Sequence, residues 1–271
     1  MFQIIIEECQ LRNYSPRTVK TYLYYNQKFI KFCDKKPQEV TYKDIRSYLL
    51  YLISKGLSSS YVNLAHNALN FYYKQIMKRN FQEIKFQKRE QKIKPLLSTK
   101  EIGKIIYKIK NPKHKLAISL LYASGIRVSE LVKIKINDLD LERELLLVRQ
   151  GKGKKDRYTI LSKKIVEEIK HHLWTRKKRS NYLFPSFDVN KHLSTRAIQE
   201  VISRAAWKAK IAKLATPHRL RHSFATHLMD NGVEDRKIHK LLGHKDIRTT
   251  QTYARTTFRH IVGIPSPHDL L

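Results

Sequence analysis

The most informative stretch of this chain spans residues 216–222 and reads Thr216-Pro217-His218-Arg219-Leu220-Arg221-His222. A proline directly after a threonine is typical of a helix start, so a helix is expected over residues 217–230. His218 and Arg221 are spaced to lie on one face near its N-terminus, where the helix dipole also attracts an anion. The pattern predicts that both side chains bind a phosphate, although a surface pair without a role can have the same spacing.

A second cluster follows downstream, where Leu241-Leu242-Gly243-His244 precedes Thr250-Gln251-Thr252-Tyr253. Gly243 is expected to end a helix over residues 234–241 and to leave His244 at the turn. A further helix is expected over residues 246–253, and if this segment folds compactly it brings Tyr253 back towards His244, where the surrounding positive charges favour the phenolate. By number alone, however, one of 15 tyrosines is more often a core residue than a nucleophile.

These residue types suit the cleavage of phosphodiester bonds. The anionic oxygens of a phosphodiester repel a nucleophile and the departing alkoxide needs a proton, so an enzyme must neutralise the first and protonate the second. Metal-dependent nucleases hold divalent ions with carboxylates, but acidic residues are scarce in this sequence and form no such cluster. We therefore expect cationic side chains, without a metal or other cofactor, and a tyrosine nucleophile.

The composition predicts a polyanionic partner. Lysine and arginine total 55 against 23 aspartates and glutamates, which gives a net charge of +32 and an isoelectric point near 10.1. Residues 1–90 contain 16 basic and 7 acidic residues, so 39 and 16 remain for residues 91–271. Because the excess is spread along the chain, both parts are expected to contact the same nucleic acid as a clamp.

A membrane anchor, a structural zinc site and disulfide bonds are not expected. The apolar run Ile4-Ile5-Ile6 is cut short by Glu7-Glu8, so the sequence predicts neither a signal peptide nor a membrane anchor. Cys9 and Cys33 form no Cys-x-x-Cys pair, which argues against structural zinc and favours a reducing, cytoplasmic location.

The sequence predicts two domains joined by a linker. Residues 1–81 contain short amphipathic helices with start signals at Ser15-Pro16, near Thr41 and at residues 58–60. Residues 82–95 lose periodicity and are mostly charged, as expected of an interdomain linker. The second domain is expected over residues 96–271, with a capping box at Ser98 and Glu101 and a C-terminal tail from about residue 254.

The second domain is expected to be mainly helical with a small antiparallel sheet. Two β-prone runs, residues 145–148 and 158–161, flank a Gly- and Lys-rich turn at 151–156 and predict a hairpin. The helices expected around it, besides those named above, cover residues 114–123, ended by Gly125, a segment from Arg127 to Val132, and residues 162–176 and 194–210.

The third helix of the first domain, expected over residues 58–78, has a polar and nearly uncharged stripe. Its members are Asn63, Asn67, Asn70 and Lys74. Asparagine can bind adenine bidentately in the major groove, so the stripe is a candidate DNA-facing surface. An ordinary solvated helix face has the same pattern.

Five blocks of the chain, in order and spacing, resemble the tyrosine recombinases and among them the Xer-type site-specific recombinases. They are Ser124–Leu131, Gly151–Arg157, Thr216–His227, Leu241–His244 and Thr252-Tyr253. The segment Tyr14–Thr18 and the helices around it resemble the SAM-like core-binding domain of the same family. The resemblance implies a helical core-binding domain and a catalytic domain that together form a C-shaped clamp on double-stranded DNA.

The resemblance also implies roles for the cationic residues. Arg127 and Arg221 would clamp the non-bridging oxygens of the scissile phosphate, for which the planar fork of guanidinium is suited. His218 would assist proton transfer from the tyrosine and bind the phosphate, and His244 would donate a hydrogen bond to a phosphate oxygen.

The remaining implied roles concern the nucleophile and the acid. Tyr253 would attack the phosphorus and form a 3′-phosphotyrosyl bond, and Lys152 would protonate the departing 5′ oxygen. Lys154 and Lys155 are near enough to compete for the role of the acid, and the family pattern alone favours Lys152. Glu130, one helical turn after Arg127, would orient the cationic groups.

Partners are implied by the same resemblance. Family members assemble as tetramers on paired sites through their C-terminal tails. Here Pro265 and Pro267 restrict any terminal helix to about residues 256–263, so packing of the tail onto its own domain is the alternative. The sequence leaves two roles open, chromosome dimer resolution and the integration and excision of a mobile element. It also leaves open whether an accessory protein takes part.

Two other functions share parts of this pattern. A type IB topoisomerase uses a similar set of residues to relax supercoils, and strand exchange between two DNA molecules would distinguish it. A non-catalytic DNA-binding protein would use the same cations to hold phosphates and would form no covalent adduct with DNA.

Overall fold

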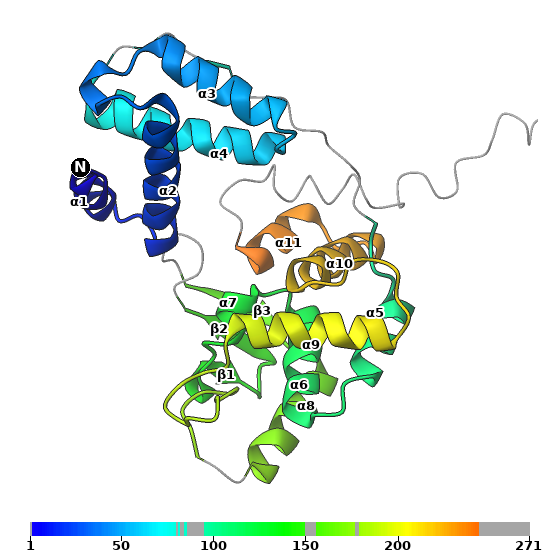
Figure 1. Cartoon of the computed structure of the whole chain (residues 1–271). Helices are drawn as coiled ribbons and strands as arrows, with labels where there is room; N and C mark the ends of the chain where they lie inside the picture. The colour runs from blue at the N-terminus through cyan, green and yellow to red at the C-terminus, as the bar shows by residue number, and fades with distance from the viewer. Residues whose placement is uncertain are drawn as a thin grey trace, which may run out of the picture. The chain divides into compact units, whose positions relative to one another are not determined.

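A computed structural model describes residues 2–79, 81, 84–85, 95–149, 156–176 and 179–243. The chain divides into two compact units, Met1–Lys92 (unit 1) and Ile93–Leu271 (unit 2) (Figure 1). Most of the linker predicted over residues 82–95 lies outside the described residues. Among the described residues, no helix has the length and hydrophobicity needed to cross a lipid bilayer.

Unit 1 is a helical bundle with an aromatic core. Its elements are α1 (Gln3–Leu11), α2 (Pro16–Cys33), η1 (Pro37–Glu39), α3 (Tyr42–Ser54), α4 (Ser59–Asn70) and η2 (Phe71–Ile76). The predicted starts are confirmed, because the side chains of Ser15, Thr41 and Ser58 each accept a hydrogen bond from the main-chain N–H three residues on. The short helix α1 precedes the first of these starts.

One residue of the polar stripe predicted for α4, Asn63, does not lie on the surface. Asn63 is 4% exposed, because α4 packs against both α2 and α3 and turns this position inward. Leu64 occupies the outward position instead, followed by Asn67. In η2, Lys74 is exposed, and Asn70 at the end of α4 is half-buried. The surface left for a partner therefore contains Asn67, Asn70 and Lys74 but not Asn63.

Unit 2 is mainly α-helical with one small sheet, as predicted. Its elements are α5 (Thr99–Tyr107), α6 (Pro112–Ser124), α7 (Val128–Leu131), η3 (Ile136–Asp138), β1 (Leu139–Asp140), β2 (Leu145–Val148), β3 (Arg157–Ile160), α8 (Lys163–Thr175), α9 (Thr195–Lys208), α10 (Pro217–Asp230) and α11 (Asp235–Leu242). The strands are antiparallel in the order β1-β2-β3, and Leu146 pairs with both Leu139 and Thr159. The two predicted strands are confirmed, whereas β1 was not expected.

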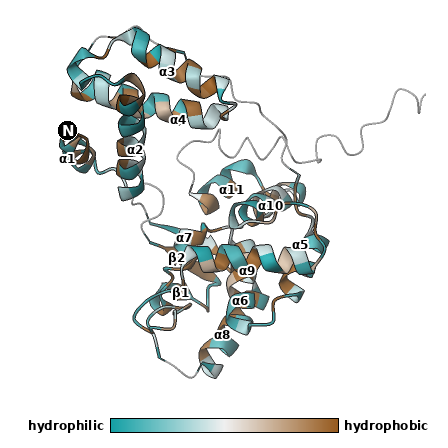
Figure 2. Cartoon of the chain, in the orientation of Figure 1, coloured by the Kyte–Doolittle hydropathy of each residue, from teal (hydrophilic) through white to brown (hydrophobic). Residues whose placement is uncertain are grey.

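The core of unit 2 is built around α6. Its residues Leu116, Ala117, Ile118, Leu120 and Leu121 are buried, because α5, α8, α9 and α10 all pack against this helix. A smaller apolar cluster joins α10 to α11. Figure 2 shows hydrophilic and hydrophobic residues mixed around the outer helices of both units, as expected for helices that bury one face. The central position of α6 fixes the turn that follows it, where the candidate site lies.

Candidate active site

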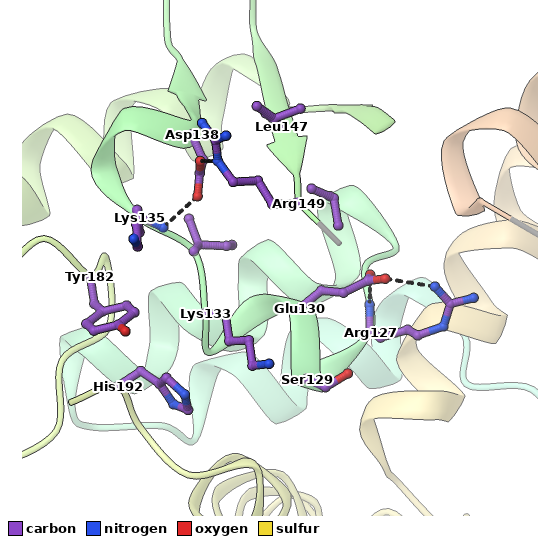
Figure 3. A pocket seen from close by; sticks show the side chains of 12 residues that line it. Arg127, Ser129, Glu130, Lys133, Lys135, Asp138, Leu147, Arg149, Tyr182 and His192 are labelled. Atoms are coloured by element: carbon purple, nitrogen blue, oxygen red, sulfur yellow. Dashed lines mark hydrogen bonds and ion pairs between the residues drawn. The ribbon is translucent and has the colours of Figure 1, made fainter. Parts of the chain in front are cut away.

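The turn after α6 places Arg127. Gly125 ends α6 with φ +61°, and a Cβ at this position would lie 2.2 Å from the Phe224 ring, so both the conformation and the packing require glycine. Arg127 then precedes α7, and its main-chain N–H donates to Glu130 Oε2 at 2.8 Å. The Arg127 Nη1 donates to Glu130 Oε1 at 2.8 Å, and the arginine side chain stays 28% exposed (Figure 3). A solvent-accessible guanidinium is thus held by one carboxylate.

Arg221 reaches the same turn from α10. Its Nη1 donates to the Gly125 carbonyl oxygen at 2.6 Å and its Nη2 to the Leu242 carbonyl oxygen at 2.7 Å. Arg221 is 3% exposed, whereas His218, one turn earlier on α10, is exposed. The structure therefore joins Arg221 to the segment that carries Arg127, although the two positions are far apart in the sequence.

Arg157 is a site residue to which the sequence assigned no role. It lies at the start of β3, and its Nη1 and Nη2 donate to Glu130 Oε1 and Oε2 at 3.0 and 2.8 Å. Its Nε donates to the Leu241 carbonyl oxygen at 2.9 Å. Glu130 is thus shared by two guanidinium groups, those of Arg127 and Arg157. Arg157 belongs to the Gly- and Lys-rich block quoted above, and no local signal separates it from the neighbouring cations.

The two arginines change the acidity of Glu130. Burial raises the pKa of this carboxyl, but the hydrogen bonds from Arg157, from the Arg127 N–H and from the Arg127 side chain, together with the charge of Arg157, outweigh that effect. The result is a pKa of about 2 instead of 4.5. Glu130 is therefore ionised at any working pH and serves as a fixed negative charge between two cations.

The C-terminal end of α11 is anchored to the same cluster. Its last carbonyl groups, from Leu241 and Leu242, accept hydrogen bonds from Arg157 and Arg221. Cations at this end of a helix interact favourably with the helix dipole. Gly243 ends the helix with φ +60°, as predicted, and a Cβ there would lie 2.6 Å from Arg157 Cδ. The backbone that leads to residue 244 is thus packed against Arg157.

A cavity of about 670 Å³ borders Arg127 on the side of the sheet. Figure 3 shows Tyr182 and His192 on one side and Glu130 and Arg127 on the other, with Lys133 between them. The cavity is also lined by Ser129, Ile134, Lys135, Asp138, Leu147, Val148 and Arg149.

The charges that line this cavity favour an anion. Arg149 Nε donates to the buried Asp138 at 2.5 Å, so that carboxylate is neutralised, as Glu130 is by its two arginines. The main-chain N–H of Lys135 donates to Asp138, but within the described part of the chain the ammonium groups of Lys133 and Lys135 form no ion pair with a carboxylate. Their ammonium groups leave the cavity positively charged.

Three predicted site residues, Lys152, His244 and Tyr253, lie outside the described residues, as do Lys154 and Lys155. Their roles therefore stay predictions. Two further histidines of α10 are packed or hydrogen-bonded: His222 is buried, and His227 Nδ1 lies 2.8 Å from the Tyr122 hydroxyl. Within the described ranges, no three His, Cys, Asp or Glu side chains gather closely enough to hold a metal ion.

Comparisons with known proteins cover nearly the whole chain. A family model described as "Phage integrase family" matches residues 91–260, and one described as "Phage integrase, N-terminal SAM-like domain" matches residues 1–83. The chain is 33% identical to the putative integrase/recombinase y4qK of Sinorhizobium fredii, over 99% of this chain and 88% of that protein. It is 36% identical to the tyrosine recombinase XerA of Pyrococcus horikoshii, over 93% of this chain and 87% of that protein.

Solved structures share the fold. The crystal structure of the XerH site-specific recombinase, bound to palindromic difH substrate in a post-cleavage complex, matches with a TM-score of 0.77 at 22% identity. The match covers 92% of this chain and 79% of that one.

Proposed function

The chain belongs to the phage integrase family, as a tyrosine recombinase of the Xer type, and we propose that it cuts and rejoins double-stranded DNA through Tyr253. In this proposal, Tyr253 forms a covalent bond to the 3′ phosphate of the cut strand. The reaction needs neither a metal nor another cofactor, because the phosphotyrosyl bond keeps the energy of the broken linkage.

The observation that carries the proposal is the joining of Arg127 and Arg221 at one turn. The Arg221 guanidinium donates a hydrogen bond to the carbonyl oxygen of Gly125, two residues before Arg127. The Arg127 guanidinium in turn donates a hydrogen bond to the Glu130 carboxylate. Guanidinium groups stay charged at any working pH and bind phosphate oxygens with a fixed fork, so this pair suits a scissile phosphate. Electrostatic stabilisation of this kind lowers the barrier for attack on an anionic phosphodiester.

The proposed reaction proceeds in two balanced steps. The Tyr253 oxygen attacks the phosphorus and its proton leaves with the help of His218, while the bond from phosphorus to the 5′ oxygen breaks and Lys152 protonates that oxygen. His244 donates a hydrogen bond to a phosphate oxygen. In the second step a 5′ hydroxyl attacks the phosphorus and gives its proton back to Lys152, while the bond from phosphorus to the Tyr253 oxygen breaks and that oxygen regains a proton with the help of His218. Phosphodiester bonds are thereby exchanged without loss of energy.

The distribution of charge supports DNA as the substrate. Residues 1–90 and 91–271 both carry excess positive charge, and the lysine-lined cavity lies beside Arg127. We assign Lys133 and Lys135 to phosphates that flank the scissile one, and Asn67, Asn70 and Lys74 to DNA contacts of unit 1. The XerH structure, which shares the fold, was solved on its DNA substrate.

We further propose that the protein assembles as a tetramer on two paired sites through its C-terminal tail, with both units clamped on the DNA. Its role is either chromosome dimer resolution or integration and excision of a mobile element. Relatives are named both XerA and putative integrase/recombinase, so the identity of the recombined site has to distinguish the two roles. Strand exchange between two duplexes distinguishes recombination from topoisomerase-like relaxation.

Covalent trapping tests the nucleophile. The full-length protein is incubated with duplex fragments tiled across the DNA that flanks its coding sequence, denatured, and the protein-linked fragments are sequenced. We expect Tyr253→Phe to abolish the adducts while DNA binding by mobility shift stays close to that of the wild type. Tyr107→Phe, which changes an exposed tyrosine of α5, serves as the matched control and should form adducts normally. Adducts that persist in Tyr253→Phe would refute the assignment.

A further inference from the structure

The guanidinium of Arg157 connects three parts of unit 2 that are distant in sequence. Its two Nη atoms bind both oxygens of Glu130, 27 positions away, at 3.0 and 2.8 Å. Its Nε binds the Leu241 carbonyl oxygen, 84 positions away, at 2.9 Å. The side chain itself belongs to strand β3 and is 10% exposed. Every nitrogen of the group therefore donates a hydrogen bond inside the protein.

We propose that Arg157 is a positioning residue for the cleavage reaction. It holds Glu130, and through Glu130 the guanidinium of Arg127, in a fixed relation to the C-terminal end of α11. The inference rests on the proposed function, in which Arg127 binds the scissile phosphate. Arg157 is not assigned any contact with DNA, since its three nitrogens all donate to Glu130 and Leu241.

The geometry requires arginine at this position. The planar fork pairs with both carboxylate oxygens while the third nitrogen points along the side chain to a different acceptor. A lysine has a single ammonium group, so it can bridge one carboxylate oxygen to a carbonyl but cannot pair with both oxygens of Glu130 while it also binds the Leu241 carbonyl. Gly243 supports this arrangement, because a Cβ there would lie 2.6 Å from Arg157 Cδ and 2.9 Å from Arg157 Nε.

Loss of Arg157 should slow cleavage more than it weakens DNA binding. Without it, Glu130 keeps its bonds to Arg127 but loses the contact that ties both to α11. Misplacement of reacting groups by about 1 Å costs roughly 100-fold in rate, and loss of a group that orients active-site residues costs about 10- to 100-fold. Because the nitrogens of Arg157 are occupied by Glu130 and Leu241 and no DNA contact is assigned to them, the affinity for DNA should change little.

Lys213 offers a closely matched control in the same unit. Its Nζ donates to Glu101 Oε2 and to the Leu96 carbonyl oxygen, both at 2.8 Å. Glu101 in turn accepts the Ser98 N–H at the start of α5, as Glu130 accepts that of Arg127 at the start of α7. Both cations thus bridge a helix-capping glutamate to a main-chain carbonyl, but Lys213 does so away from Arg127.

The first experiment measures cleavage on bound DNA. A fragment recovered by covalent trapping is added at saturating concentration, and the rate of adduct formation is followed in a single turnover for Arg157→Ala, Arg157→Lys and Lys213→Ala. We expect Arg157→Ala to be slower by about 30- to 100-fold with an affinity within about threefold of wild type, and Arg157→Lys to recover only part of the rate. Lys213→Ala should cleave at close to the wild-type rate. Equal rates for Arg157→Ala and wild type would overturn the proposal.

The second experiment needs no DNA. Hydrogen exchange of a peptide covering residues 235–243 should become faster in Arg157→Ala, because the end of α11 loses its anchor, and should be unchanged in Lys213→Ala. Unchanged exchange in Arg157→Ala would show that this residue does not hold α11 and would overturn the proposal. A wild-type protein that forms no adduct would instead refute the proposed function, so the two failures are distinguishable.

Discussion

Replacement of Glu130 by glutamine tests how far the cluster of arginines depends on one carboxylate. Burial raises the pKa of Glu130, but the hydrogen bonds from Arg157 and Arg127 and the charge of Arg157 lower it from 4.5 to about 2. A carboxyl group whose pKa falls this far on folding stabilises the folded state by roughly 3 kcal/mol at neutral pH. We therefore expect Glu130→Gln to lower the free energy of unfolding of unit 2 by about 3 kcal/mol at pH 7.

The same linkage determines how the effect varies with pH. Because the pKa of Glu130 in the folded state lies below its unfolded value of 4.5, the stabilisation is complete above about pH 5 and is lost as the pH falls towards about 2. The difference between wild type and Glu130→Gln should therefore be about half as large near pH 3 as at pH 7.

Hydrogen exchange of the buried helices provides the assay. The slowest amides of α6 and α10 report the global opening of unit 2 alone, so unit 1 does not interfere. Glu101→Gln is the matched control, because Glu101 also caps a helix and pairs with a cation but is more exposed, and its loss should be smaller. A loss below about 1 kcal/mol at pH 7, the range of an exposed ion pair, would refute the reasoning, as would an equal loss at both pH values.

Two further predictions concern the cavity and the turn after α6. On a random-sequence duplex, the double variant Lys133→Ala, Lys135→Ala should make the slope of log affinity against log salt concentration less negative by about 1 to 2. Each lost phosphate contact accounts for about 0.9 of that change. Lys170→Ala on α8 is the control and should leave the slope unchanged. An unchanged slope in the double variant would remove these lysines from the DNA-binding surface. Gly125→Ala should lower the stability of unit 2 by about 3 kcal/mol, because the added Cβ meets the Phe224 ring and the left-handed conformation disfavours alanine. Thermal unfolding checks this value, and a melting temperature like that of the wild type would contradict it.

Helix boundaries were the part of the fold that local chemistry predicted best. Ser98 and Glu101 form the expected capping box, Pro217 begins α10, and Gly125 and Gly243 end α6 and α11 in left-handed conformations. In each case the signal and the structure it specifies lie within one helical turn, so no knowledge of the tertiary fold is needed. Both predicted strands of the hairpin are local in the same sense.

The sequence-based predictions failed where contacts between residues far apart in the sequence determine the structure. Periodicity places Asn63 and Asn67 on one side of α4, but the packing of α2 and α3 determines that Leu64, not Asn63, faces outward. Arg157 had no assigned role because its partners Glu130 and Leu241 are remote in sequence. The two-residue strand β1 depends entirely on its pairing with β2 and has no pattern of its own.

The way in which the arginines are held explains how a site can be rigid and still attract a phosphate. A separate carboxylate for each guanidinium would fix its position but cancel the charge that the phosphate needs. Here Arg127 and Arg157 share the single negative charge of Glu130, so their group keeps a net charge of +1. The two bonds of Arg221 described above end on the carbonyl oxygens of Gly125 and Leu242, which orient the guanidinium without neutralising it. The positive potential at this turn is therefore a consequence of using one carboxylate and several backbone carbonyls as the supports.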